Sequence, residues 1–236
     1  MTYSDDADSR LTARHKVSLD ILCQLQPSGL ILNVGCGNGC LEYLENRLHL
    51  IKRARIISLD INIENLREAR GSGATAVCAR IDNLPFSKEV FSVVCAFEVL
   101  EHLSENHIKQ FLSDVLCVSL TNVRLAISTP YADARSVIFD PAFWLVGHKH
   151  YSRRYLQNTL NQYGFVIQNC YVLGGIWEGF SVILLYLFKY LVRREIPFKS
   201  TFEKNKEREY SIGTNKITKG FMNIFITSIR KDASHI

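Results

Sequence analysis

The sequence has little that would direct the chain out of the cell or through a membrane. Its first ten residues are polar and acidic and hold no apolar run, so no secretory signal is expected. The longest apolar run without a charge, Gly179 to Phe188, is shorter than the roughly 20 residues that a membrane-spanning helix needs. No internal repeat is visible. The formal charge of +5 permits an acidic partner but does not require one.

The seven cysteines lack the pattern of a disulfide framework or of a zinc site. Their number is odd and most of them lie within apolar runs, which predicts buried, reduced thiols in an intracellular protein. Cys36 and Cys40 are four residues apart, but no second pair of ligands accompanies them. We therefore expect a cytoplasmic protein, with a peripheral position at the inner face of a membrane as the alternative.

The chain does contain a regular alternation of apolar strands and helical patterns, and 47% of its 236 residues are hydrophobic. This alternation predicts an α/β fold with a doubly wound, mostly parallel sheet. No helix follows the last predicted strand, so this strand is expected to insert antiparallel. We expect one domain over residues 1–236. The predicted strands cover residues 30–33, 55–59, 75–79, 90–97, 123–128, 165–172 and 221–229.

A glycine turn follows the first of these strands and precedes a helical pattern. Gly35, Gly37 and Gly39 stand at every second position, which differs from the G-x-G-x-x-G spacing of dinucleotide-binding proteins. Such a turn brings bare backbone against a ligand at the carboxyl end of a strand. Asp60 ends the second predicted strand, where a carboxylate can accept hydrogen bonds from the two hydroxyls of a ribose. Together these features predict a site for a nucleoside cofactor.

The ordered set of motifs resembles the class I S-adenosylmethionine-dependent methyltransferases, in the broad group that acts on small molecules. The resemblance implies a Rossmann-like fold with a seven-stranded, mostly parallel sheet and an antiparallel last strand. It also implies S-adenosylmethionine as the cofactor. The segments that carry it are 33–39 (NVGCGNG), 59–61 (LDI), 83–86 (NLPF), 97–103 (FEVLEHL), 147–152 (GHKHYS) and 163–165 (YGF).

The resemblance assigns cofactor-binding roles to single residues. Gly35, Gly37 and the backbone at Cys36 would approach the methionine portion of the cofactor. Asp60 would hold the ribose, and Ile61 would pack on the face of the adenine. The full set that the resemblance implies is Asn33, Gly35, Cys36, Gly37, Asp60, Ile61, Ile81, Asp82 and Phe97.

The remaining members of that set include two departures from the family pattern. Ile81 and Asp82 would lie near the edge of the adenine, and Phe97 near the sulfonium. The family usually has an acid where this chain has Asn33, whose amide keeps an acceptor oxygen but loses the charge. Arg80 stands where the family often has an aspartate that contacts the adenine amino group, and Asp82 is the available substitute.

Methyl transfer needs a base only if the acceptor holds its proton near neutral pH. The candidates for this catalytic role are His102, His148 and Tyr151, with His150 as a further histidine of the same segment. The His148-x-His150 pair on an extended segment directs both rings to one side, which would supply two metal ligands. No third ligand is evident in the sequence, so no metal site is predicted.

An unusual apolar segment, residues 174–198, separates the last two predicted strands. It is expected to form a helical insertion, either as a buried cap over the active site or as a helix in a membrane interface. In the second alternative Lys189, Arg193 and Arg194 would meet anionic lipid.

The leading functional hypothesis is a methyltransferase that acts on a small-molecule or lipid-linked acceptor. One alternative is a non-catalytic protein of the same fold whose cofactor site has decayed. The other is an RNA methyltransferase, which the basic end of the chain favours. No RNA-binding module and no interleaved basic and aromatic stripe is visible, so nucleic acid is not an expected partner.

Overall fold

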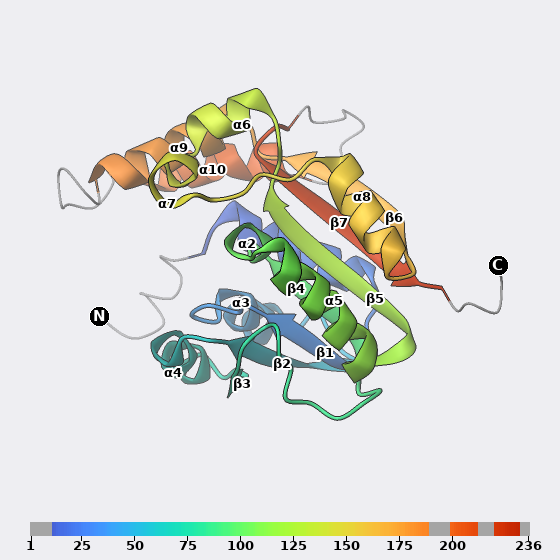
Figure 1. The fold of residues 1–236 in the computed structure, drawn as a ribbon. Coiled ribbons are helices and arrows are strands. Elements are labelled where there is room, and N and C mark those ends of the chain that lie inside the picture. The colour runs from blue at the N-terminus through green and yellow to red at the C-terminus, as the bar shows by residue number, and fades with distance from the viewer. Residues whose placement is uncertain (1–10, 189–198, 212–219, 232–236) are drawn as a thin grey trace.

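The computed structural model describes residues 11–188, 199–211 and 220–231. Seven strands form one sheet in the order β3-β2-β1-β4-β5-β7-β6 (Figure 1). The first five strands pair in parallel, and β7 lies antiparallel between β5 and β6. The predicted fold class is therefore confirmed. The strands are β1 (Gly29–Val34), β2 (Ala54–Asp60), β3 (Thr75–Cys78), β4 (Phe91–Phe97), β5 (Ser119–Pro130), β6 (Phe165–Leu173) and β7 (Asn223–Arg230).

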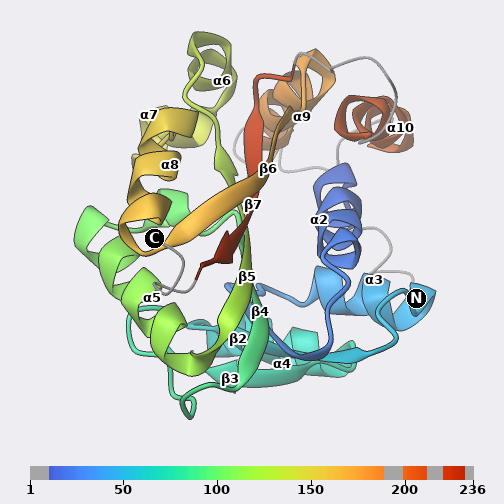
Figure 2. The same ribbon diagram turned by 90° about the vertical axis from the view of Figure 1, so that its right-hand side faces the viewer.

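The central strand β4 is apolar along its length because helices cover both faces of the sheet. Val93, Val94, Cys95 and Ala96 are completely buried, as expected for a strand inside an α/β sheet. Helices α2 and α3 pack on one face, and α5 and α8 pack on the other (Figure 2). These helices are α2 (Ala13–Gln24), α3 (Cys40–Leu48), α5 (Glu105–Val118) and α8 (Arg153–Gln162), while α4 (Ile63–Gly71) contacts β2 and β3.

Local capping fixes where these helices begin. The Ser104 hydroxyl accepts a hydrogen bond from the His107 amide at the start of α5, and the Ser152 hydroxyl does the same for Tyr155 in α8. Helix α5 ends at Val118 because β5 begins at Ser119.

A group of helices, which we call the lid helices, stands beyond the carboxyl end of β5 (Figure 1). Two of them follow β5, and two lie between β6 and β7. They contact one another through α6 and α9, α7 and α9, and α9 and α10. The lid helices are α6 (Ala134–Phe139), α7 (Pro141–Val146), α9 (Ile176–Leu187) and α10 (Lys199–Tyr210).

Helix α9, which lies in the apolar segment, is partly buried and partly exposed, so it shows features of both alternatives. Glu178 and Gly179 are buried against the rest of the protein, whereas Ile176, Phe180 and Leu187 are about half exposed. Residues 189–198, with Lys189, Arg193 and Arg194, lie outside the described residues. In the described ranges, no helix has the length and apolar character needed to cross a membrane.

The cysteines differ from the prediction of generally buried thiols. Cys40 and Cys95 are buried, but Cys78 and Cys117 are exposed because they lie at the end of the edge strand β3 and on the outer face of α5. All seven are free thiols.

Candidate active site

Two cavities meet at the carboxyl ends of the parallel strands. The first, about 440 Å³, lies between the glycine turn and η1 (Leu100–His102), and we call it the glycine-turn cavity. The second, about 600 Å³, lies under α9 and α10, and we call it the lid cavity. Glu98 and His102 line both cavities. The two spaces therefore adjoin at the end of β4.

The glycine turn has the backbone geometry that its spacing predicts. Gly35, Gly37 and Gly39 all have positive φ, between +54° and +78°. A Cβ on Gly35 would lie 2.4 Å from the side chain of Val99, so the protein itself excludes a side chain there. A Cβ on Gly37 would meet nothing within 4 Å. Protein packing therefore leaves the space beside Gly37 open to a ligand.

Asp60 connects this turn to the start of α4. Its Oδ2 accepts a hydrogen bond of 2.8 Å from the Gly37 amide, and its Oδ1 accepts one of 2.8 Å from the Asn62 amide. The carboxylate lines the glycine-turn cavity although the residue is only 8% exposed. Each carboxylate oxygen keeps a further lone pair, so Asp60 can hold the turn and still accept from a ligand.

The opposite wall of the glycine-turn cavity is formed partly by residues that the resemblance named. Ile61, Ile81 and Asp82 line it, and so does Arg80. Arg80 donates to both carboxylate oxygens of Asp82, at 2.8 and 2.7 Å. These hydrogen bonds hold the pKa of Asp82 below its usual value. Arg80, which departs from the family pattern, thus holds in place Asp82, the carboxylate that was expected to replace the family's aspartate.

Other predicted cofactor residues lie away from the cavities. Gly37 and Cys36 belong to the turn, but neither they nor Phe97 are among the residues that line a cavity. Asn33 is buried, and its amide donates a 2.7 Å hydrogen bond to Glu42 in α3. Burial raises the pKa of Glu42, and the neutral amide of Asn33 is a suitable partner for it. The structure therefore gives Asn33 a role in joining β1 to α3.

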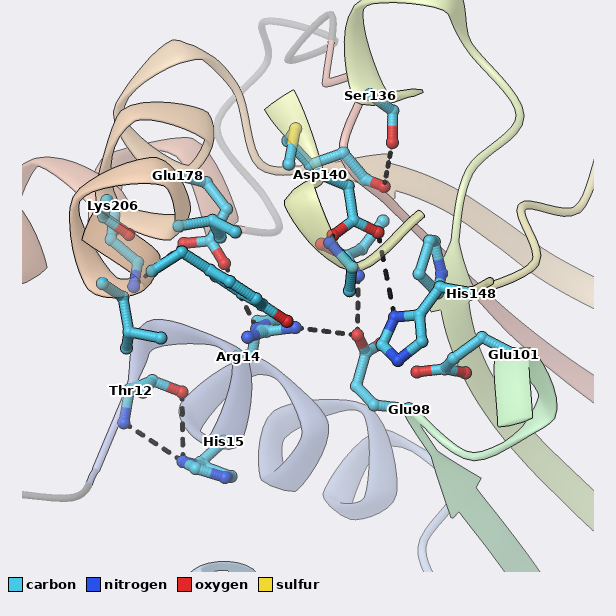
Figure 3. A pocket seen from close by; sticks show the side chains of 18 of the residues that line it. Thr12, Arg14, His15, Glu98, Glu101, Ser136, Asp140, His148, Glu178 and Lys206 are labelled. Carbon is cyan, nitrogen blue, oxygen red and sulfur yellow. Dashed lines mark hydrogen bonds and ion pairs between the residues drawn. The ribbon is translucent and has the colours of Figure 1, made fainter. Parts of the chain in front are cut away.

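A chain of charged residues crosses the lid cavity (Figure 3). Arg14 in α2 pairs with Glu98 at 2.8 Å and with Glu178 in α9 at 3.2 Å. Lys206 in α10 pairs with Glu178 and Glu203, both at 2.9 Å. Burial alone would lower the pKa of Arg14, but the charges of Glu178 and Glu98 raise it overall. The chain of charges joins α2, α9 and α10 to the end of β4.

Glu98, where the cavities meet, has an unusual backbone conformation. Its φ is +56°, which is uncommon for a residue other than glycine and costs about 1 kcal/mol or more. Its carboxylate accepts hydrogen bonds from Ser128 at 2.6 Å, Asn223 at 2.8 Å and Arg14 at 2.8 Å. These three donors hold the strained residue in place. The sequence analysis did not single out Glu98, and its place in the segment FEVLEH was the available signal.

Of the three candidate bases, Tyr151 lies outside both cavities. Its hydroxyl donates a 3.1 Å hydrogen bond to the Leu100 carbonyl, and burial raises its pKa to about 12. These contacts give Tyr151 a structural role, in contrast to the catalytic role considered for it. His102 and His148 both line the lid cavity, and their rings pack edge to face with centroids 4.5 Å apart.

The two histidines of the His148-x-His150 pair lie on one side of their segment, as their spacing predicts, and both face Asp140. Its Oδ2 lies 3.0 Å from Nε2 of His150 and 3.8 Å from Nδ1 of His148. The other ring nitrogen of His150 lies 3.2 Å from the Ser136 hydroxyl. Within the described part of the chain, no group of three or more histidine, cysteine, aspartate or glutamate residues has the arrangement of a metal site.

Comparisons with known proteins agree with this geometry. Residues 31–119 match the family model described as a methyltransferase domain. Over 75 residues, which are 32% of this chain, it is 37% identical to malonyl-[acyl-carrier protein] O-methyltransferase from Herminiimonas arsenicoxydans. The chain spans only 28% of the length of that relative.

Solved structures extend the likeness to nearly the whole fold. A SAM-dependent methyltransferase from Archaeoglobus fulgidus has a TM-score of 0.61 at 15% identity, over 92% of this chain and 94% of that one. Geranyl diphosphate C-methyltransferase from Streptomyces coelicolor, in complex with Mg²⁺, geranyl diphosphate and S-adenosyl-L-homocysteine, has a TM-score of 0.57 at 13% identity. That match covers 87% of this chain and 73% of that one.

The family-model match shows a methyltransferase domain over residues 31–119, and the sheet order is that of the similar SAM-dependent methyltransferase structures. These findings are consistent with the class I S-adenosylmethionine-dependent methyltransferases, which the sequence resembles.

The residues of the glycine-turn cavity fit the cofactor of this family, S-adenosylmethionine. Gly35 lines this cavity with bare backbone, and the Asp60 carboxylate, which also lines it, can hold a ribose. Ile61 and Ile81 offer apolar walls to an adenine. When bound, the cofactor supplies a methyl group on a sulfonium, which is already an activated leaving group. The chain has only to bind it, exclude water and align an acceptor.

Replacement of Gly37 by valine is expected to abolish binding of S-adenosylhomocysteine while the circular dichroism spectrum stays near that of the wild type. The added side chain has room in the protein but occupies the space beside the turn. Isothermal titration calorimetry measures the loss. Gly164→Val is the matched control, because Gly164 has a similar positive φ and lies far from both cavities. Equal affinities of the two variants would mean that the Gly37 backbone faces away from the ligand.

Proposed function

We propose that this protein transfers a methyl group from S-adenosylmethionine, held in the glycine-turn cavity, to a small-molecule acceptor held in the lid cavity. The observation that carries the proposal is the junction of the two cavities at Glu98 and His102. A methyl donor on one side of this junction and an acceptor on the other would be close enough for direct transfer. Holding both reactants in line supplies much of the acceleration of such a reaction.

The lid cavity supports a partly apolar acceptor, either a small molecule or a lipid-linked one. Its volume of about 600 Å³ lies within the range of small-molecule pockets. Val182, Leu185 and Tyr186 of α9 contribute to its wall, together with Arg14 of α2 and Glu98, which follows β4. Two of the similar proteins are named for acceptors of this kind, malonyl groups on a carrier protein and geranyl diphosphate.

The outer side of the lid helices supports contact with a membrane surface, from which a lipid-linked acceptor could enter. Large apolar side chains on α6 and α7 are about two thirds exposed, and those on α9 are about half exposed. An interfacial helix binds lipid through such side chains, and basic residues add attraction to anionic headgroups. The exposed apolar residues of α6, α7 and α9 are Ile138, Trp144, Leu145, Val146, Ile176, Trp177, Phe180, Leu185 and Leu187.

The protein is expected to co-sediment with vesicles of phosphatidylglycerol and much less with vesicles of phosphatidylcholine. Replacing Trp144 and Leu145 of α7 by serine should weaken the association, because both side chains are about two thirds exposed. Leu48→Ser together with Leu50→Ser is the matched control, since these half-exposed residues lie at the end of α3. Changing Lys189, Arg193 and Arg194 to glutamine tests the basic residues outside the described ranges. If the wild type stays in the supernatant with both lipids, the lid helices serve only to cover the cavity.

The activity itself is tested in two steps. Calorimetry with S-adenosylhomocysteine measures cofactor binding, and absence of binding would favour the non-catalytic alternative. Transfer of a tritiated methyl group is then measured on a panel of phenols, carboxylic acids, prenyl diphosphates and transcribed RNA. The proposal expects incorporation into at least one small molecule. Incorporation into RNA alone would overturn it in favour of the RNA methyltransferase.

A further inference from the structure

We propose that His102 is the catalytic base that removes the proton from the acceptor, and that His148, which lies beside Asp140, positions its ring. This inference rests on the proposed function, since it assigns a step of that reaction to particular residues. It starts from the location of His102 in η1, directly after β4, where its ring lines both the glycine-turn cavity and the lid cavity.

The ring of His102 is free to act, in contrast to the polar groups around it. Its only described ring contact is the edge-to-face packing on His148, and no described residue hydrogen-bonds to its nitrogens. The carboxylate of Glu98 already accepts from three donors. Glu101 is buried and accepts a hydrogen bond from Thr129. Burial raises the pKa of Glu101 well above its usual value, so this carboxyl favours its protonated form.

The charges that face His102 keep it able to accept a proton. Partial burial lowers its pKa below 6.5, and repulsion from His148 lowers it further, while the negative charge of Glu98 opposes these effects. Glu101 faces the same cavity in its neutral form, and Asp140 lies behind His148. His102 is therefore mainly neutral at pH 7, which is the form that a general base requires.

The second histidine holds the ring of His102 in place at the junction of the cavities. The His102 and His148 rings are in contact, and Nδ1 of His148 lies 3.8 Å from the Asp140 carboxylate. Burial alone would raise the pKa of Asp140, but the hydrogen bonds to His150 and from the Ala142 amide hold it below its usual value, so this carboxylate stays charged. Asp140 is a positioning residue in this scheme, because it acts through His148 and does not touch the acceptor.

The bonds of the step balance without a further reactant. A lone pair of the acceptor atom forms the bond to the methyl carbon, and the bond from that carbon to sulfur breaks with its electron pair remaining on sulfur. The acceptor proton moves to a ring nitrogen of His102. The methylated acceptor, a neutral thioether and a protonated His102 remain, and His102, which is exposed, returns its proton to solvent.

The first experiment measures the protonation of His102 directly and needs no acceptor. Protein labelled with ¹⁵N in its histidine rings is titrated by NMR, with the His102→Gln spectrum giving the assignment. The His102 pKa is expected below 6.5, and it should rise in His148→Gln because a repelling neighbour is removed. S-adenosylhomocysteine should shift the His102 resonances. A His102 pKa above 7, or one that does not respond to His148→Gln, would overturn the proposal.

The second experiment measures turnover on the phenols and carboxylic acids of the panel described above. His102→Gln is expected to lower kcat by about 100-fold or more on phenols, the usual range for loss of a general base. Carboxylic acids are already ionised at pH 7, so their turnover should fall much less. The affinity for S-adenosylhomocysteine should change less than about threefold. Asp140→Asn should lower kcat on phenols less than His102→Gln, and His49→Asn at the exposed end of α3 is the control.

Each outcome of the second experiment has a distinct meaning. Unchanged kcat of His102→Gln on phenols would overturn the base assignment and leave the proposed function standing. Turnover by the wild type of carboxylic acids alone would do the same. Loss of wild-type turnover in EDTA, restored by Mn²⁺, would make His102 a metal ligand and not a base. Absence of any turnover by the wild type would overturn the proposed function and this inference with it.

Discussion

Replacement of Asp60 by alanine is expected to leave a folded protein that binds S-adenosylhomocysteine tens to hundreds of times more weakly. The loss of a charge-assisted pair of hydrogen bonds to the ribose costs about 2–4 kcal/mol. The structure adds a second contribution, because Asp60 also holds the Gly37 amide at 2.8 Å and so fixes the turn that receives the cofactor. Calorimetry at pH 7 measures the affinity.

A substitution at the neighbouring Asn62 is the control for a loss of local stability. Asn62 caps α4 by accepting a hydrogen bond from the Glu64 amide, and its amide is the other donor to Asp60. Asn62→Ala should lower stability by about 1 kcal/mol, the usual cost of a lost cap, with little change in affinity. An unchanged affinity of Asp60→Ala would show that this carboxylate does not face the ribose.

Replacement of Lys206 by methionine is expected to lower the free energy of unfolding by about 3–5 kcal/mol. Lys206 and Glu178 are 4% and 1% exposed, and removal of one partner leaves a buried charge without its compensation. Arg14 at 3.2 Å and Glu203 remain, but neither replaces the ammonium group beside Oε2 of Glu178. Equilibrium unfolding in urea measures the change.

Two further variants make this prediction specific. The double variant Glu178→Leu with Lys206→Met removes both charges and should recover much of the loss, because an apolar pair of similar volume can replace a buried ion pair. Lys16→Met removes a partner of the exposed Lys16–Glu207 pair and should cost less than about 1 kcal/mol. If Lys206→Met and Lys16→Met cost the same, water reaches the Glu178–Lys206 pair.

The sequence predicts the sheet and the glycine turn well because their signals are local. An apolar run such as β4 and a spacing such as Gly35, Gly37 and Gly39 depend on the backbone alone. No local sequence pattern predicts that the charged residues of the lid cavity lie together. Arg14 belongs to α2 and Glu178 to α9, and only the folded chain brings them within 3.2 Å.

Some residues that the sequence predicts for the site have side chains that point away from both cavities. Tyr151 stands beside the cavity-lining segment, yet its hydroxyl bonds to the Leu100 carbonyl. Asn33 immediately precedes the glycine turn, but its amide turns into the core to meet Glu42. The position of Glu98 at the site depends on a strained backbone and on three hydrogen-bond donors that come from other elements. Spacing along the chain does not specify such partners.

The pairing of β6 with β7 allows the helices that cover the lid cavity to be replaced by other segments. Leu173 at the end of β6 and Asn223 at the start of β7 are direct neighbours in the sheet, so the chain leaves and re-enters the sheet at one point. A short turn is sufficient to join two such strands, and lengthening the connection costs little entropy. Evolution can therefore exchange the segment that holds α9 and α10, and with it the preferred acceptor, without altering the pairing of any strand.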